Sequence, residues 1–278
     1  MILPKNILRY DRQISLLGQA GQSRLYQSVI GLVGLGGGGS HVAVQAAHAG
    51  FGTILLVDND VIEESNLSRL VGMGPADVGK PKVAAYASLL PLLNPETVVV
   101  PVQERFPSPK SVEILKQVDV LIGCVDTFHA RKELQNFCWR YLIPFVDIGI
   151  GTSTGNPSAQ RSVAAIDGHV HTHIPGGPCM WCVGLLSKER LELELAGQGP
   201  EYIRGAANPS QIVSFNGLVG SLGVIEAMRI RTGFLEGGAN NRFFRFQGAT
   251  NELLKIRASR DPACHVCTGE LGMGEVVW

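Results

Sequence analysis

The sequence predicts an α/β fold: a doubly wound, mainly parallel sheet followed by antiparallel strands and a four-cysteine zinc site. Three observations favour this class. Short apolar runs alternate with helix-length segments through residues 1–150, and crossovers of that length join parallel strands. A glycine cluster follows the first apolar run, as it does where a strand leads into a Rossmann-like nucleotide-binding helix. After residue 150 alternating polar and apolar residues indicate antiparallel strands, and two C-x-x-C pairs occur.

Length and composition bound the class of protein. The 278 residues, with a mass of 29.8 kDa, suit one large α/β domain. The formal net charge is +0, so no basic excess points to nucleic acid or to a membrane surface. No apolar run approaches the roughly 18–20 residues of a membrane span, and the charged N-terminus lacks a signal-peptide cleavage site. We therefore expect a cytoplasmic protein.

The first half is expected to alternate strands and helices in order. Short helices within 6–28 precede a buried strand from Val29 to Leu35. A small-residue helix over 40–50 leads to a second strand, 53–57, which ends at Asp58. The alternation continues with helices over 82–93, 111–117 and 130–141 and strands over 97–102, 118–125 and 143–148.

The second half has a different pattern. Alternating runs within 158–174 predict antiparallel strands, and the polar segment 187–210 predicts a mobile loop or a short helix. The apolar helix expected over 211–230 contains several small residues, so a neighbouring element should approach it closely. Late strands are expected over 242–246 and 253–257.

The glycine cluster has the spacing of a phosphate-binding loop. Gly34, Gly36 and Gly39 satisfy G-x-G-x-x-G between a strand and a helix. Glycines let the backbone turn tightly and approach a phosphate, and the helix N-terminus supplies N–H groups. Asp58 lies 19 residues beyond Gly39, where an acid binds a ribose hydroxyl. The pattern alone predicts a nucleotide and leaves a dinucleotide and ATP open.

The residues after the second strand favour ATP. Four polar or cationic residues follow it, namely Asn66, Arg69, Lys80 and Lys82. A dinucleotide does not need them, whereas the extra negative charge of a triphosphate must be neutralised. Asp126, at a later strand end, is well placed for Mg²⁺. The structural alternative is that Asn66 caps a turn, Lys80 is solvent-exposed and Asp126 caps the next helix.

The C-x-x-C pairs predict a structural zinc site. Cys179 and Cys182 form one pair, and Cys264 and Cys267 the other. In a cytosolic protein this spacing favours a metal over disulfides. The 81 residues between the pairs exceed a self-contained finger, so the fold must bring two knuckles together in a closed site.

The remaining cysteines and three histidines are assigned structural roles. Cys124 and Cys138 fall on a buried strand and a helix and are interpreted as core residues. His169, His171 and His173 share one face of a strand. They could bind a metal, but exposed strand histidines are the commoner case and are the expectation here.

Several motifs occur in the order found in a known family. They are residues 9–13, 34–40, 56–60, 65–69, 79–82 and 94–95, Cys124 to Asp126 with Arg131, and the two knuckles. The chain resembles the ubiquitin-activating-enzyme superfamily, within it the compact MoeB/ThiF/HesA-type adenylyltransferases, over about residues 9–270. The resemblance implies a single adenylation domain over 1–278, with an ATP-binding half, 1–150, and a partner-binding and zinc half, 151–278.

The resemblance also implies an activity. Such proteins bind ATP and Mg²⁺ and adenylate the C-terminal glycine of a ubiquitin-like or sulfur-carrier protein. Arg12 would reach across a homodimer to the phosphates of the partner subunit. Asp58 would bind the ribose and Asp126 would bind Mg²⁺, and catalysis would rest on Arg12, Arg69, Lys82 and Asp126 without a protein nucleophile. Carried over by position, the nucleotide-binding residues would be Gly34, Gly36, Gly37, Gly39, Asp58, Asp60, Asn66, Arg69, Lys82 and Asp126.

One departure from the family pattern concerns the fate of the adenylated tail. Members that transfer the activated tail to their own cysteine carry it between the knuckles, and residues 183–263 contain none. Unless Cys124 or Cys138 moves, the reaction should stop at the acyl-adenylate, and a thiol on another protein would attack it. The alternatives are activation of a small peptide or a tRNA base, a non-catalytic scaffold subunit and, more distantly, an NAD-dependent dehydrogenase.

Overall fold

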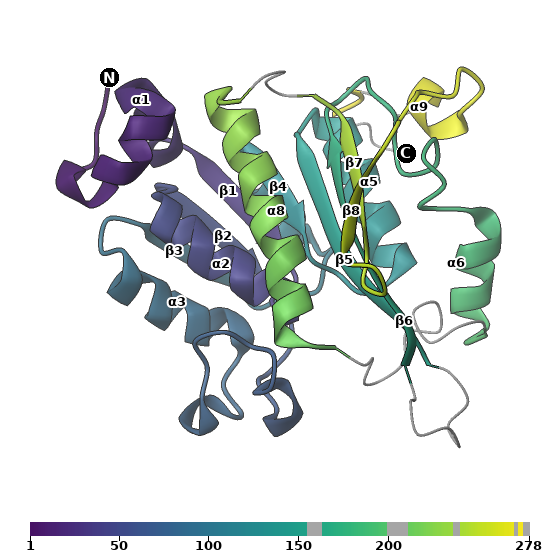
Figure 1. Ribbon diagram of the computed structural model, residues 1–278, viewed down its shortest axis with the longest axis horizontal. Coiled ribbons are helices and arrows are strands. Elements are labelled where there is room, and N and C mark those ends of the chain that lie inside the picture. The colour runs from purple at the N-terminus through teal and green to yellow at the C-terminus, as the bar shows by residue number, and fades with distance from the viewer. Residues whose placement is uncertain (155–162, 199–210, 236–239, 270–271, 275–278) are drawn as a thin grey trace.

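A single eight-stranded sheet runs through the computed structural model, which describes residues 1–154, 163–198, 211–235, 240–269 and 272–274 (Figure 1). The strand order is β3-β2-β1-β4-β5-β6-β7-β8. In this spatial order, the five strands from β3 to β5 are parallel to one another, and each strand from β5 to β8 is antiparallel to its neighbour. The predicted fold class is therefore confirmed. The strands are β1 Val29–Val33, β2 Thr53–Val57, β3 Val98–Val102, β4 Val120–Gly123, β5 Phe145–Thr154, β6 Val163–His173, β7 Arg242–Gln247 and β8 Glu252–Ile256.

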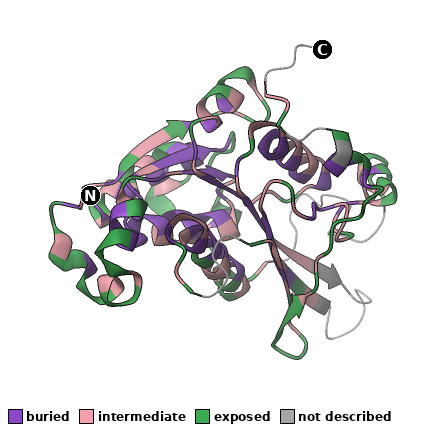
Figure 2. Cartoon of the chain, turned by 90° about the horizontal axis from the view of Figure 1, so that it is seen from above, coloured by how far each residue is buried: buried purple, intermediate pink, exposed green. Residues whose placement is uncertain are grey.

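The helices pack on both faces of this sheet. They are η1 Ile7–Tyr10, α1 Asp11–Tyr26, α2 Gly37–Ala49, η2 Glu64–Asn66, η3 Pro75–Asp77, α3 Lys82–Leu93, α4 Pro109–Leu115, α5 Phe128–Tyr141, α6 Lys188–Leu195, α8 Val213–Thr232 and α9 His265–Gly269. One hydrophobic core lies between the sheet and α2, α3 and α8, and a second lies between the sheet and α4, α5 and α6. The central strands β1, β2 and β4 are mostly buried, whereas the edge strands β3 and β8 are mostly not (Figure 2). None of the helices in the described ranges has the length and apolar character needed to cross a membrane.

Most predicted elements are found, with two informative differences. Helix α2 begins at Gly37 and not at Ser40, because the glycines themselves form its first turn. Strand β5 continues to Thr154 and not only to Ile148, since its pairing with β6 extends the ladder. The segment expected as a loop or short helix contains α6, and its residues 199–210 lie outside the described part of the chain.

Helix α8 approaches α2 as closely as its small residues predicted. A Cβ at Gly217 would lie 2.9 Å from His41 Cε1, and one at Gly220 would lie 2.9 Å from His41 Cβ. In Figure 1, α8 runs across the sheet beside α2. Helix α8 therefore belongs to the same layer as α2, the helix that follows the glycine loop.

The sheet has a topological switch point beside β1. This strand pairs with β2 on one side and with β4 on the other. The chain adds β2 and β3 on one side of β1 and then crosses over to add β4 on the other side. In open α/β sheets ligands bind beyond the carboxyl ends of the strands at such a point. Gly34, Asp58 and Asp126 all lie at this edge, after β1, β2 and β4.

Two of the three strand histidines are fully buried and His169 is partly buried, which corrects the expectation that they are exposed. His171 and His173 lie on β6 and are fully buried, with ring centroids 3.7 Å apart. Phe145 stacks on His173, and Phe243 contacts His171. No nitrogen of either ring has a hydrogen-bond partner within the described residues. Burial lowers the pKa of His171 to about 3 and that of His173 well below its ordinary value.

This burial predicts a loss of stability in mild acid. The folded-state pKa values lie below the unfolded value near 6.5, so the unfolded chain binds the extra protons as the pH falls below about 6.5. Each histidine should then cost up to about 1.4 kcal/mol of unfolding free energy per pH unit. Urea unfolding followed by circular dichroism between about pH 7.5 and about pH 5.5 measures the slope. A His171→Met/His173→Met variant should have a shallower slope, and an unchanged slope would contradict the assignment.

Candidate active site at the edge of the parallel strands

A cavity of about 720 Å³ opens at the carboxyl ends of β1, β2, β4 and β5. Most of the residues predicted for nucleotide binding line it. They are Gly34, Gly36, Gly37, Asp58, Asp60, Asn66, Arg69, Lys82 and Asp126. Three predicted residues, Gly39, Lys80 and Arg12, do not line it. The fold thus gathers into one cavity residues that span more than ninety positions of the sequence.

The glycine loop brings the N-terminus of α2 against the end of β1. Gly34 has φ of +91°, a conformation that favours glycine, and a Cβ there would lie 2.7 Å from the Cys124 carbonyl oxygen. A Cβ at Gly39 would lie 2.0 Å from the Gly34 carbonyl oxygen. Gly39 is therefore needed for packing of the helix on the loop, which explains why it is absent from the cavity wall. The first N–H groups of α2 remain available at the cavity.

Asp58 is held in place by the backbone. Its Oδ2 accepts a hydrogen bond from the Leu35 N–H at 2.6 Å, and its Oδ1 accepts one from the Asp60 N–H at 2.8 Å. Each carboxylate oxygen can accept a second hydrogen bond, so Asp58 keeps capacity for a hydroxyl donor in the cavity. Burial raises the pKa of Asp58, and the positive charge of Lys82 opposes that shift.

The polar residues after β2 adopt distinct roles. Asn66 is buried at the end of η2, where its Oδ1 accepts a hydrogen bond from the Glu63 N–H at 3.3 Å, so it both stabilises a turn and lines the cavity. Arg69 Nη1 donates to the Ser65 carbonyl oxygen at 2.8 Å. Lys80, which the sequence grouped with these residues, pairs instead with Asp77 at 2.8 Å and does not line the cavity.

Lys82 is a buried cation at the cavity. It is the first residue of α3, and its Nζ lies 2.8 Å from Asp60 Oδ2. The Asp60 carboxylate is exposed, so the pair is broken at modest cost when a stronger anion competes for the ammonium group. Lys82 is therefore available to a polyanionic ligand.

Asp126 presents an exposed carboxylate to the cavity. Within the described residues its side chain makes no hydrogen bond or ion pair. The interpretation of Asp126 as a helix cap is wrong, because the Thr127 hydroxyl accepts the Ala130 N–H at 3.2 Å and caps α5. A free carboxylate oxygen suits a hard cation such as Mg²⁺, so the donor chemistry here fits that ion.

Some cavity residues could not be assigned from sequence. Gln211 and Asn216, at the start of α8, line the wall beside Gly37, where a Cβ would lie 2.3 Å from Asn216 Nδ2. Arg131 also lines the cavity and interacts with Asp147 and His169, which the sequence did not bring together. The signal for Asn216 was a polar residue in a largely apolar helix, and its position depends on the packing of α8 on α2.

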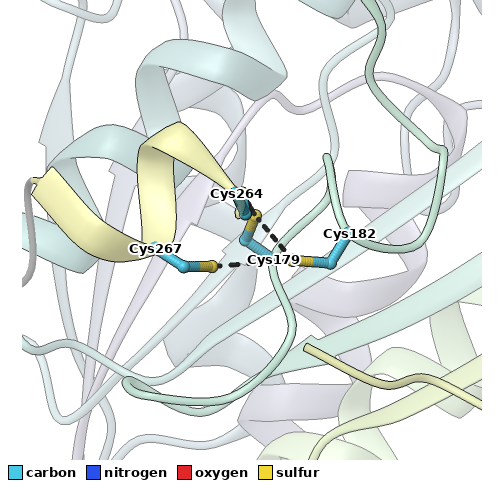
Figure 3. Close-up of side chains that lie close together, drawn as sticks. All are labelled: Cys179, Cys182, Cys264 and Cys267. Carbon is cyan, nitrogen blue, oxygen red and sulfur yellow. Dashed lines mark hydrogen bonds between the residues drawn. The ribbon is translucent and has the colours of Figure 1, made fainter. Parts of the chain in front are cut away.

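The four knuckle cysteines meet in one cluster, as predicted (Figure 3). Their sulfur atoms all lie within 4.8 Å of one another. Cys179 Sγ is 3.7 Å from that of Cys182 and 3.6 Å from that of Cys264, and the Cys182 and Cys267 sulfurs are 3.7 Å apart. A tetrahedron of Zn–S bonds of about 2.3 Å has edges of about 3.8 Å. The arrangement therefore fits a tetrahedral zinc ion held by four thiolates.

The other two cysteines differ in their surroundings. Cys138 is fully buried in the core, as expected. Cys124 is only half-buried and lines the cavity, so it is not wholly a core residue. Burial raises the pKa of both thiols well above its ordinary value, which disfavours the nucleophilic thiolate form.

Known proteins resemble this chain in sequence and in fold. The model of the ThiF family matches residues 10–266. The molybdopterin-synthase adenylyltransferase of Escherichia coli K12 is 29% identical over 266 residues, covering 95% of this chain and 97% of that protein. The SAMP-activating enzyme E1 of Haloferax volcanii is 30% identical over 271 residues, covering 96% and 91%. The structure of E. coli MccB with ATP superposes with a TM-score of 0.76 over 95% of this chain and 76% of that one, at 22% identity, which supports the fold.

The cysteine cluster predicts a bound, stabilising zinc ion. Replacing Cys179 and Cys182 by Ser removes two thiolate ligands, so zinc content should fall to a small fraction of one ion per chain and the melting temperature should drop by several degrees. Elemental analysis and scanning calorimetry measure the two quantities. Cys138→Ala removes a buried thiol outside the cluster and should retain zinc. Full zinc content in the Cys179→Ser/Cys182→Ser variant would reject the site.

Proposed function

The chain belongs to the ThiF family, and from that premise we propose that it is an ATP-dependent adenylyltransferase acting on the C-terminal glycine of a ubiquitin-like or sulfur-carrier protein. Its relatives include a molybdopterin-synthase adenylyltransferase and a SAMP-activating enzyme. The observation that carries the proposal is the single cavity that combines a glycine loop, the backbone-held Asp58, the cations Arg69 and Lys82 and the free Asp126 carboxylate.

The proposed nucleotide pose follows from these groups. Asp58 has acceptor capacity for a ribose hydroxyl at the end of β2. The N–H groups at the start of α2 favour phosphate. Arg69 and Lys82 add the charge that a triphosphate requires, with Lys82 exchanging its pairing with Asp60 for a phosphate oxygen.

The proposed reaction is attack of a glycine carboxylate on the α-phosphorus, which forms the acyl-adenylate and releases pyrophosphate. Negative charge grows on the bridging and leaving oxygens, and Lys82, Arg69 and the α2 N–H groups are arranged to stabilise it. Mg²⁺ bound by Asp126 would neutralise further phosphate charge. The polar start of α8, with Gln211 and Asn216, lines the cavity beside Gly37, and in the proposal the carboxylate tail enters past these side chains.

Arg12 supports a homodimeric site. It is exposed on α1 and does not line the cavity of its own chain. Leu8 and Leu16, on either side of it in sequence, are 81% and 65% exposed, an unusual exposure for leucine that suits a subunit contact. In the proposal, Arg12 completes the cavity of the partner subunit, as an arginine supplied in trans.

The acyl-adenylate is proposed to be the end product on this chain. Residues 183–263, between the knuckles, contain no cysteine. Cys138 is buried, and the raised pKa of the Cys124 thiol disfavours attack by it. A thiol on a second protein would therefore accept the activated tail.

ATP–pyrophosphate exchange tests the proposed activity. Exchange should require a carrier protein that ends in Gly-Gly. It should fall by at least about a hundredfold in Asp126→Ala, with unchanged circular dichroism, because a charge-stabilising group is lost. Glu113→Ala, which removes an exposed ion pair with Lys116, is the matched control and should keep full exchange. Exchange supported by a short peptide instead would redirect the proposal to peptide activation, and nucleotide binding without exchange would favour a scaffold subunit.

Mixing of inactive variants tests the shared site. Arg12→Ala and Asp126→Ala should each be inactive alone. In an equal mixture half of the dimers are mixed, and each mixed dimer has one intact site, so about a quarter of wild-type exchange should return. Absence of recovery in mixtures shown to exchange subunits would place Arg12 outside the partner's site.

A further inference from the structure

A buried charged network lies beneath the cavity. Arg131 comes from α5, Asp147 from β5 and His169 from β6. Asp147 is fully buried, and its Oδ2 accepts a short hydrogen bond from Arg131 Nη1. His169 Nε2 lies 2.6 Å from the same oxygen. Three elements are thus joined through one carboxylate oxygen.

The Arg131 guanidinium links the turn after β4 to the neighbouring strand β5. Its Nη2 donates to the Val125 carbonyl oxygen at 2.6 Å, and its Nη1 donates to the Ile148 carbonyl oxygen at 3.1 Å. Val125 follows β4 and directly precedes Asp126, whereas Ile148 lies in β5. The planar fork therefore fixes the turn that carries Asp126 relative to the neighbouring strand.

The network is packed around the backbone of Gly149. A Cβ at this residue would lie 2.5 Å from Arg131 Nη2 and 2.5 Å from His169 Cε1. A buried ion pair contributes little net stability compared with apolar residues of similar size. Because this ion pair lies under the Val125–Asp126 turn of the cavity, its role is to position that turn.

We propose that Arg131, Asp147 and His169 are positioning residues that hold the Val125–Asp126 turn so that the Asp126 carboxylate faces the metal of a bound Mg·ATP. The inference rests on the proposed function. His169 orients Asp147, Asp147 orients the guanidinium of Arg131, and Arg131 holds the carbonyl group next to Asp126. Asp126, which has no partner of its own within the described residues, depends on this support for its position. Such outer partners of a metal ligand tune metal affinity.

ATP affinity measured by calorimetry with EDTA and with Mg²⁺ tests the network. In Asp147→Asn and His169→Leu, the Mg²⁺ concentration that gives half of the Mg²⁺-dependent gain in ATP affinity should rise by about 10–100-fold. ATP affinity in EDTA should stay within about twofold of wild type, because the variants leave the glycine loop and Asp58 intact. His169→Gln keeps an N–H donor near the Nε2 position and should recover most of the wild-type Mg²⁺ dependence.

Asp119→Asn is the matched control. It weakens an ion pair between Asp119 and Arg231, 2.9 Å apart, away from the cavity, and should leave the Mg²⁺ dependence unchanged. Equal losses of affinity with EDTA and with Mg²⁺ in His169→Leu would indicate a merely structural role and overturn the inference, as would an unchanged Mg²⁺ dependence. Since His169 is only partly buried, its variants test the inference even when Asp147→Asn does not fold. Wild-type protein that binds no ATP would overturn the proposed function as well.

Discussion

The close contact of α2 with the end of β1 is the constraint on which the rest of the site depends. Residue 39 faces the Gly34 carbonyl oxygen so closely that no side chain fits there. This contact aims the first turn of α2 at the carboxyl edge of the sheet. Helix α8 then packs on α2 through its own glycines, which places Asn216 on the cavity wall. A bulkier residue at any of these contacts would move the helix ends away from the strands.

Two ion pairs at the cavity differ in how easily they can be exchanged for a ligand. Lys82 pairs with an exposed carboxylate, Asp60, so its partner can be exchanged. Arg131 pairs with Asp147 in full burial and makes further hydrogen bonds to two carbonyl groups, so it stays in place. One cation can follow a ligand while the other maintains the shape of the wall. This division is what a site needs if it is to be both responsive and preorganised.

Local patterns predicted the elements whose environment is set by their own residues. Strand β2 and helix α3 have the predicted bounds, and the C-x-x-C pairs meet although 81 residues separate them. The sequence pattern did not predict burial where that burial depends on elements distant in the sequence. Alternation along β6 placed His171 and His173 on one face, but that face is covered by aromatic residues of β5, α5 and β7. The contacts of Arg131 with β5 and β6 are likewise tertiary, so no spacing in the sequence indicates them.

The cysteine cluster also constrains the segment of chain between its two C-x-x-C pairs. A zinc ion that links residues 179–182 to 264–267 would close a loop of about 81 residues. By loop-closure estimates, the lost entropy of the unfolded chain stabilises the fold by about 4.5 kcal/mol at room temperature. Because this term grows only with the logarithm of loop length, added residues in the connections outside α8, β7 and β8 cost little. With zinc bound, the connections between the elements of this loop can differ in length at little cost, whereas α8 within the loop is held by its packing on α2.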